Sequence, residues 1–82
     1  MKRLPRDISG NQLAHILIGF GYRITRQTGS HMRLTTEING VNHITIPRHD
    51  TLRVGTLASI IASLGSHHGM DRDELLEELF GE

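Results

Sequence analysis

The stretch YRITRQTGSHMRLTTEINGVNHITIP, residues 22–47, decides the fold. Three segments within it have the apolar–polar alternation or the β-branched content that is typical of strands: 22–26, 32–35 and 41–46. Gly29–Ser30 and Asn39–Gly40 supply the turns between them. Pro47 ends the third segment because it cannot donate a ladder hydrogen bond. We therefore expect a three-stranded antiparallel sheet.

Polarity also selects the register of these strands. A three-residue loop at 38–40, with a left-handed glycine, pairs Leu34 with Ile44, whereas a two-residue turn would mix charged and apolar side chains. A three-residue loop at 28–30 likewise pairs Ile24 with Leu34. The face toward the core is then apolar: Tyr22, Ile24, Met32, Leu34, Ile44 and Ile46. The opposite face, called here the open face, is polar: Arg23, Thr25, Gln27, His31, Arg33, Thr35, His43 and Thr45.

Helices are predicted before and after the sheet segment in the sequence. A Ser9–Gln12 capping box precedes apolar residues at helical spacing that continue to Phe20. A second helix is expected to begin at an N-cap on Thr56 and to end at Gly65, because glycine commonly follows a helix. This interpretation leaves His67–His68 in a loop.

The C-terminal residues predict a short third helix at 71–80, started by a second capping box at Asp71–Glu74. The expected order is α-β-β-β-α with this extra helix, which is an α+β fold. Because 82 residues are enough for one small domain, we expect a single domain over 1–82, with a core fold at 8–65 and an acidic helix at 71–80.

Composition and charge limit the possible classes of protein. The chain has no cysteine, which excludes disulfides and thiolate metal sites, and no apolar run that predicts a membrane span or a secretory signal, so we expect a cytoplasmic protein. Residues 1–53 carry eight Lys and Arg against three Asp and Glu, a net +5, whereas residues 71–82 carry one against six, a net −5. The acidic helix either screens an anion-binding face or has a merely solvated surface.

The start of the second strand carries a possible chemistry. His31 follows Gly29 and Ser30, with Arg33 two residues on and Arg23 expected one strand across. An imidazole can take or return a proton near neutral pH, and guanidinium groups can hold a phosphodiester. The glycine permits close approach of a phosphate to the backbone, and the serine hydroxyl can donate to it. This set suits metal-free cleavage of RNA, in which the 2′-hydroxyl is the nucleophile.

Other histidines and arginines have weaker signals. His43, on the open face, either assists His31 or is simply solvated, and His15 is expected at the surface of a helix. His67–His68 is adjacent to no obvious third ligand, so we expect no metal and no cofactor. A rim that contacts RNA or a protein partner is expected from three arginines: Arg26, Arg48 and Arg53.

Several segments occur together in the order found in one known family: 2–10, Gly21–Tyr22, 26–31, Ile44–Pro47, Gly55–Thr56–Leu57, Ile60–Ile61 and Leu64–Gly65. They resemble the HicA family of toxins, also called YcfA-like, over residues 2–65. Members are small bacterial and archaeal ribonucleases of toxin–antitoxin modules. Many carry a second histidine where this chain has Met32.

The resemblance implies a double-stranded-RNA-binding-domain-like fold and mRNA interferase activity in a stress response, with His31 as the catalytic residue. It also implies two partners, mRNA and a HicB-type antitoxin that covers the active face, and no membrane. Two alternatives stay open on the same fold: a catalytically silent RNA-binding module, and a protein-docking module.

Overall fold

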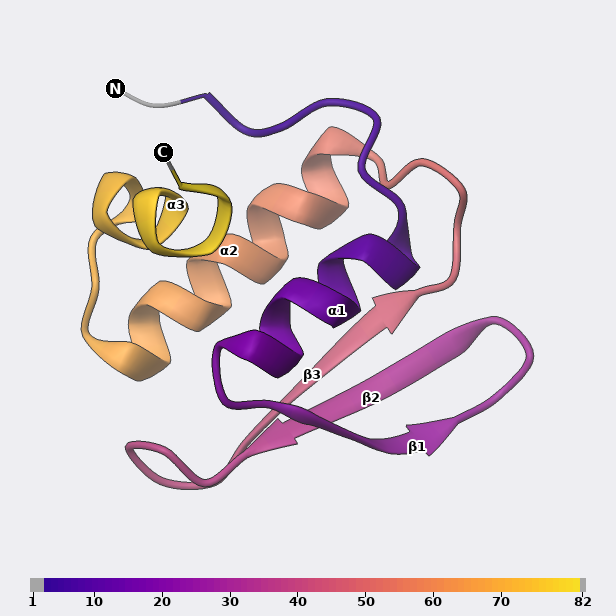
Figure 1. Ribbon diagram of the computed structural model, residues 1–82, viewed down its shortest axis with the longest axis horizontal. Coiled ribbons are helices and arrows are strands. Elements are labelled where there is room, and N and C mark those ends of the chain that lie inside the picture. The colour runs from indigo at the N-terminus through magenta and orange to yellow at the C-terminus, as the bar shows by residue number, and fades with distance from the viewer. Residues whose placement is uncertain (1–2, 82) are drawn as a thin grey trace.

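The computed structural model describes residues 3–81 and places three helices on one side of a three-stranded sheet (Figure 1). The elements are α1 (Gly10–Gly19), β1 (Arg23–Gln27), β2 (His31–Thr36), β3 (Asn42–Pro47), α2 (Val54–His68) and α3 (Arg72–Phe80). This confirms the predicted α+β class, its element order and its antiparallel sheet. No helix within 3–81 is long and apolar enough to cross a membrane.

Helix α1 begins at the predicted capping box. The Ser9 hydroxyl accepts a hydrogen bond from the Gln12 N–H at 3.0 Å, and Gln12 Oε1 accepts one from the Ser9 N–H at 2.8 Å. Two backbone donors of the first turn, which have no partner inside the helix, are thereby satisfied. The chain leaves α1 through Gly21, whose φ of +106° is strained for any residue with a side chain.

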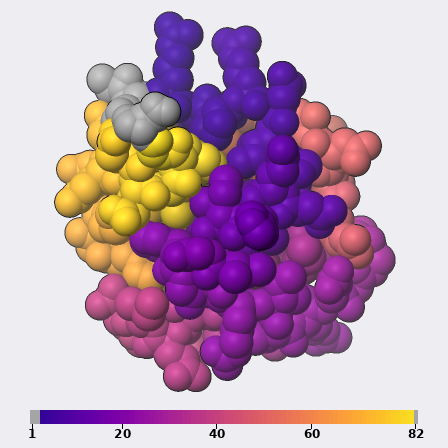
Figure 2. All heavy atoms as spheres, viewed as in Figure 1, coloured from indigo at the N-terminus to yellow at the C-terminus, as the bar shows by residue number. Residues whose placement is uncertain are grey.

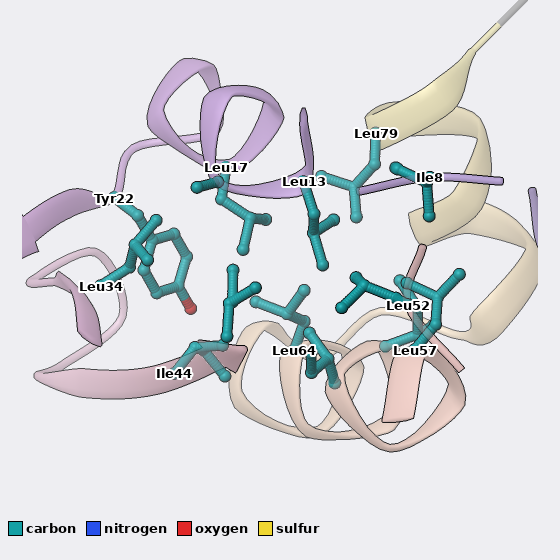
Figure 3. Close-up of a cluster of buried hydrophobic side chains, with 14 of the residues drawn as sticks. Ile8, Leu13, Leu17, Tyr22, Leu34, Ile44, Leu52, Leu57, Leu64 and Leu79 are labelled. Carbon is teal, nitrogen blue, oxygen red and sulfur yellow. The ribbon is translucent and has the colours of Figure 1, made fainter. Parts of the chain in front are cut away.

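The hydrophobic core lies between the sheet and the helices. Figure 3 shows Leu13 and Leu17 of α1 facing Leu64 of α2, with Leu34 and Ile44 of the sheet beside them. None of the five is more than 4% exposed. Truncation of such a side chain to alanine costs about 2–5 kcal/mol, because it leaves a cavity that the neighbours fill only in part. This cluster therefore fixes the sheet against the helices and leaves the other sheet face as the open face.

The register between β2 and β3 is the predicted one. Leu34 lies opposite Ile44, and Met32 lies opposite Ile46. Gly40 in the connecting loop has a φ of +97°, as expected, and Asn39 before it has a φ of +60°. Asparagine tolerates this left-handed region better than most residues do.

The register between β1 and β2 is only partly the predicted one. Ile24 lies opposite Leu34 as expected, but Arg26 then lies opposite Arg33, so the pairing shifts by one residue at Thr25. An extra residue of this kind is a β-bulge, which bends the strand and re-aims its side chains. The predicted core position of Ile24 is wrong, since its exposure is 40%. All five residues of β1 are exposed, so this edge strand packs less tightly than β2.

Helix α2 differs from its prediction at both ends. It begins at Val54 with Arg53 as N-cap, three residues before the expected N-cap Thr56. It continues past Gly65, where we expected it to end, and stops only at Gly69, which has a φ of +66°. The glycine at 65 serves packing instead, because a Cβ there would lie 2.8 Å from the Met70 carbonyl oxygen.

Helix α3 begins at the predicted capping box of Asp71 and Glu74, with a 2.8 Å bond from the Glu74 N–H to Asp71 Oδ1. Its buried leucines pack on α1 and α2. Figure 2 shows α3 in yellow directly against the purple atoms of α1. Figure 1 shows that α3 lies beyond α1 and α2 from the sheet. The acidic helix therefore does not cover the open face, and its charged side forms a solvated surface.

Candidate nucleic-acid site on the open face

His31 is the first residue of β2, and its side chain is exposed. The turn before it is held by Thr28, whose N–H donates to the His31 carbonyl at 2.9 Å and whose hydroxyl accepts from the His31 N–H at 3.1 Å. Ser30 Oγ lies 3.0 Å from His31 Nδ1. When Nδ1–H donates to this hydroxyl, the unprotonated Nε2 is free to act as a base.

The loop after β3 is tied to the same turn. The Arg48 N–H donates to the Ser30 carbonyl at 2.8 Å, which places the backbone of this rim arginine beside the histidine. Gly29 is exposed, and a Cβ there would meet nothing within 4 Å, so the turn is open to a ligand. Arg53 lies further along, at the N-cap of α2.

Two arginines lie directly opposite each other on the neighbouring strands. Arg33, two residues beyond His31, projects from the same face of β2, and Arg26 of β1 is its cross-strand partner. Like charges in opposed positions destabilise a sheet. An anion bound between them would relieve this repulsion, so the pair is suited to hold a phosphate near His31.

Arg23 lies on the strand next to β2, as expected, but away from His31. It pairs with Thr35, toward the other end of β2, and its guanidinium lies 3.7 Å from the Glu37 carboxylate. Arg23 is therefore one strand across, as expected, but at Thr35, four residues along β2 from His31. Of the two arginines of β1, Arg26 lies nearer to His31, because it pairs with Arg33.

The open face does not bring His43 to His31. His31 pairs with Pro47 on β3, whereas His43 pairs with Thr35. Four residues of strand separate the two positions, about 13 Å at the usual rise per residue. Direct assistance of one imidazole by the other is therefore excluded by the register.

A chain of side-chain hydrogen bonds crosses all three strands, and sequence reasoning missed it. Arg33 Nε lies 3.2 Å from Thr25 Oγ1, which lies 2.7 Å from Thr35 Oγ1. Thr35 Oγ1 lies in turn 2.8 Å from His43 Nδ1. Thr35 is only 5% exposed although it belongs to the open face. The available signal was the recurrence of threonine on the polar side of adjacent strands, but the bulge that joins these residues is not visible in that pattern.

A second group of histidines lies at the other end of the molecule. His67 and His68 belong to the last turn of α2, not to a loop as we expected. His67 Nε2 lies 3.0 Å from two carbonyl oxygens of the β2–β3 loop, those of Ile38 and Gly40. His68 Nε2 lies 2.9 Å from the Tyr22 hydroxyl.

Burial changes the proton affinities in this second group. It lowers the pKa of His68, and the neighbouring His67 lowers that pKa further. Burial raises the pKa of Tyr22, against the opposing hydrogen bond that its hydroxyl accepts from Asn42 Nδ2 at 2.8 Å. Both histidines therefore have structural partners. Among residues 3–81, no three His, Asp or Glu side chains are grouped so that they could hold a metal ion.

The geometry defines a class of protein: a small α+β fold with an exposed histidine and opposed arginines on the uncovered face of its sheet. A family model described as the HicA toxin of bacterial toxin–antitoxin systems matches residues 10–66. The match includes α1, the whole sheet and most of α2, so the chain belongs to the HicA toxin family. Helix α3 lies outside the matched range. No curated protein and no solved structure gave a match to the chain.

Proposed function

We propose that this toxin is an endoribonuclease, an mRNA interferase that cleaves mRNA in the cytoplasm without a metal ion and acts in a stress response. Membership of the HicA toxin family supports this proposal. So does the position of His31, which is exposed, has its Nδ1 beside Ser30, and stands two residues from Arg33.

In this mechanism His31 Nε2 removes the proton from a ribose 2′-hydroxyl. The 2′ oxygen attacks the adjacent phosphorus, and the bond from phosphorus to the 5′ oxygen breaks. The leaving oxygen takes a proton from solvent, and the imidazolium returns its own proton to solvent. A general base of this kind contributes typically 10²–10⁴-fold to a rate.

The cations around His31 hold the phosphodiester in this mechanism. Arg33 and Arg26 offer guanidinium donors from adjacent strands, and Arg48 is tied to the histidine turn through its backbone. Gly29 leaves space for a phosphate at the turn. Charge-assisted hydrogen bonds from such groups to phosphate oxygens are about twice as strong as neutral ones.

The observation that carries the proposal is the exposed imidazole of His31 beside the opposed arginines. The test is cleavage of an end-labelled mRNA by the wild type and by His31→Ala, with RNA binding measured separately. We expect a loss of cleavage of about 10²–10⁴-fold, with binding largely retained. His15→Ala is the matched control, since His15 is equally an exposed histidine but lies on α1. Unchanged cleavage by the His31 variant would remove the proposal.

The partner proposed for this face is a HicB-type antitoxin that covers His31 and the arginines. An acidic surface on that antitoxin would complement Arg26 and Arg33. Copurification of the toxin with the product of the adjacent gene tests this: we expect a complex in which cleavage is blocked and Arg26 is shielded from modification by phenylglyoxal. A complex that cleaves RNA normally would contradict it.

A further inference from the structure

The hydrogen-bond chain that crosses the open face begins at a group that can only donate, the Arg33 Nε–H. Thr25 Oγ1 therefore accepts this bond at 3.2 Å. The Thr25 hydroxyl lies 2.7 Å from Thr35 Oγ1 and 3.3 Å from the Arg33 carbonyl oxygen. Thr35 Oγ1 lies in turn 2.8 Å from His43 Nδ1, and the tautomer of the His43 ring sets which of these two atoms donates.

Such a chain fixes the guanidinium that begins it. Because Nε is held by Thr25, the two terminal nitrogens of Arg33 are the ones left to face a ligand. Arg26, the cross-strand partner of Arg33, carries a like charge that would repel the Arg33 guanidinium, and the bond to Thr25 resists such a displacement. The β-bulge is part of this arrangement, because Thr25, the extra residue of β1, contacts both Arg33 and Thr35.

Burial indicates which member of the chain is most constrained. Thr35 is 5% exposed, and its hydroxyl is engaged on both sides, toward Thr25 and toward His43. A buried hydroxyl with both neighbours placed this closely is restricted, since turning away from either neighbour breaks a hydrogen bond.

We propose that Thr35 and Thr25 are positioning residues of the nuclease site, which with His43 hold the Arg33 guanidinium beside His31 for contact with the phosphodiester. This inference rests on the proposed function, because it assigns the arginine its ligand. It also gives His43 a role different from assistance to His31: it is the last member of the chain.

The decisive variants are Thr35→Val, which keeps the shape and removes the hydroxyl, and Thr35→Ser, which keeps the hydroxyl. We expect Thr35→Val to lower kcat/KM for RNA cleavage about tenfold, because the arginine loses its fixed orientation, and Thr35→Ser to remain near the wild type. In an Arg33→Ala background, Thr35→Val should have no further effect, since the group that it positions is gone.

Thr36→Val is the matched control. Thr36 is the next residue of β2, but it lies on the core side, where its hydroxyl donates to the Gly21 carbonyl at 2.9 Å. We expect this variant to lower stability and to leave kcat/KM per folded molecule unchanged. An effect of Thr35→Val that persists in the Arg33→Ala background, or that Thr36→Val reproduces, would overturn the positioning role.

A measurement without RNA separates this inference from the proposed function. The Arg33 Nε–H signal in a nitrogen-15 NMR spectrum should exchange slowly with water in the wild type and much faster in Thr25→Val. This result would support the chain even if the wild type failed to cleave RNA. Equal exchange rates in the two proteins would overturn the positioning role whether or not RNA is cleaved.

Discussion

His31 and the pair of His67 and His68 lie at opposite ends of the β2–β3 hairpin, and these two groups differ in their hydrogen-bond partners. His31 is exposed at the start of β2, and its ring lies 3.0 Å from the hydroxyl of the preceding serine through Nδ1. His67 and His68 are half-buried, and they bond loop carbonyls and the Tyr22 hydroxyl. Phe20 also stacks edge-on against His68. A histidine with a free nitrogen facing solvent is available for chemistry, whereas one with satisfied nitrogens holds elements together.

The largest expected effect separates the two groups directly. His31→Gln should lower RNA cleavage by about 10²–10⁴-fold and leave stability unchanged, because the side chain is exposed. His68→Gln should do the opposite, since it disturbs the contact with Tyr22. Cleavage assays and urea unfolding of both variants measure this. If His68→Gln lost cleavage per folded molecule, the division between the two groups would be wrong.

The next effect concerns the Tyr22 hydroxyl, which links His68 of α2 to Asn42 of β3. Tyr22→Phe should lower the free energy of unfolding by about 1–3 kcal/mol, because it leaves the Asn42 amide and His68 Nε2 without their shared partner. RNA cleavage per folded molecule should not change. Urea unfolding of the variant measures the loss, and a change below about 0.5 kcal/mol would mean that the hydroxyl contributes little.

A pH dependence of stability follows from the lowered pKa of His68. The unfolded chain binds this proton near pH 6.5, whereas the folded protein binds it only at lower pH. Stability is therefore full above that value and falls as the pH drops through the lowered pKa. Urea unfolding between pH 7.5 and 5 should show this decline, and His68→Gln should flatten it. An equal slope in the wild type and the variant would contradict the assignment.

The smallest expected effect distinguishes two arginines of β1. Arg26→Ala should reduce the slope of log affinity against log salt by about 0.7, the value for one phosphate contact with a single strand. Arg23→Ala should change it less, because Arg23 is already near Glu37, an exposed pair worth about 0–1 kcal/mol to stability. Binding of an uncleavable 2′-O-methyl RNA across a salt series measures both slopes. Equal changes in the two variants would remove the special position of Arg26.

Polarity was enough to predict most of the fold. The β2–β3 register follows because only one pairing puts Leu34 and Ile44 on the core side, and both capping boxes are local patterns that tertiary packing did not alter. The end of α2 was predicted wrongly at Gly65. The sequence cannot distinguish a glycine that ends a helix from one that, like Gly65, is needed because the Met70 carbonyl lies too close for a side chain.

The site was less predictable, because it depends on one inserted residue. The alternation in β1 fits either a continuous strand or a bulge at Thr25, and only the packed sheet distinguishes them. This shift puts Arg26 opposite Arg33, where an unbroken register would have put Thr25. The exposure of His31, by contrast, was predictable, since it follows from a polar turn at the start of a strand.

Chemical rescue shows whether the His31 imidazole itself transfers the proton. Cleavage of a labelled RNA by His31→Ala is measured with increasing imidazole in the buffer, beside the wild type. We expect imidazole to restore part of the lost rate in the variant and to leave the wild-type rate unchanged. Cleavage by the variant at the wild-type rate without imidazole would mean that His31 is not the proton acceptor.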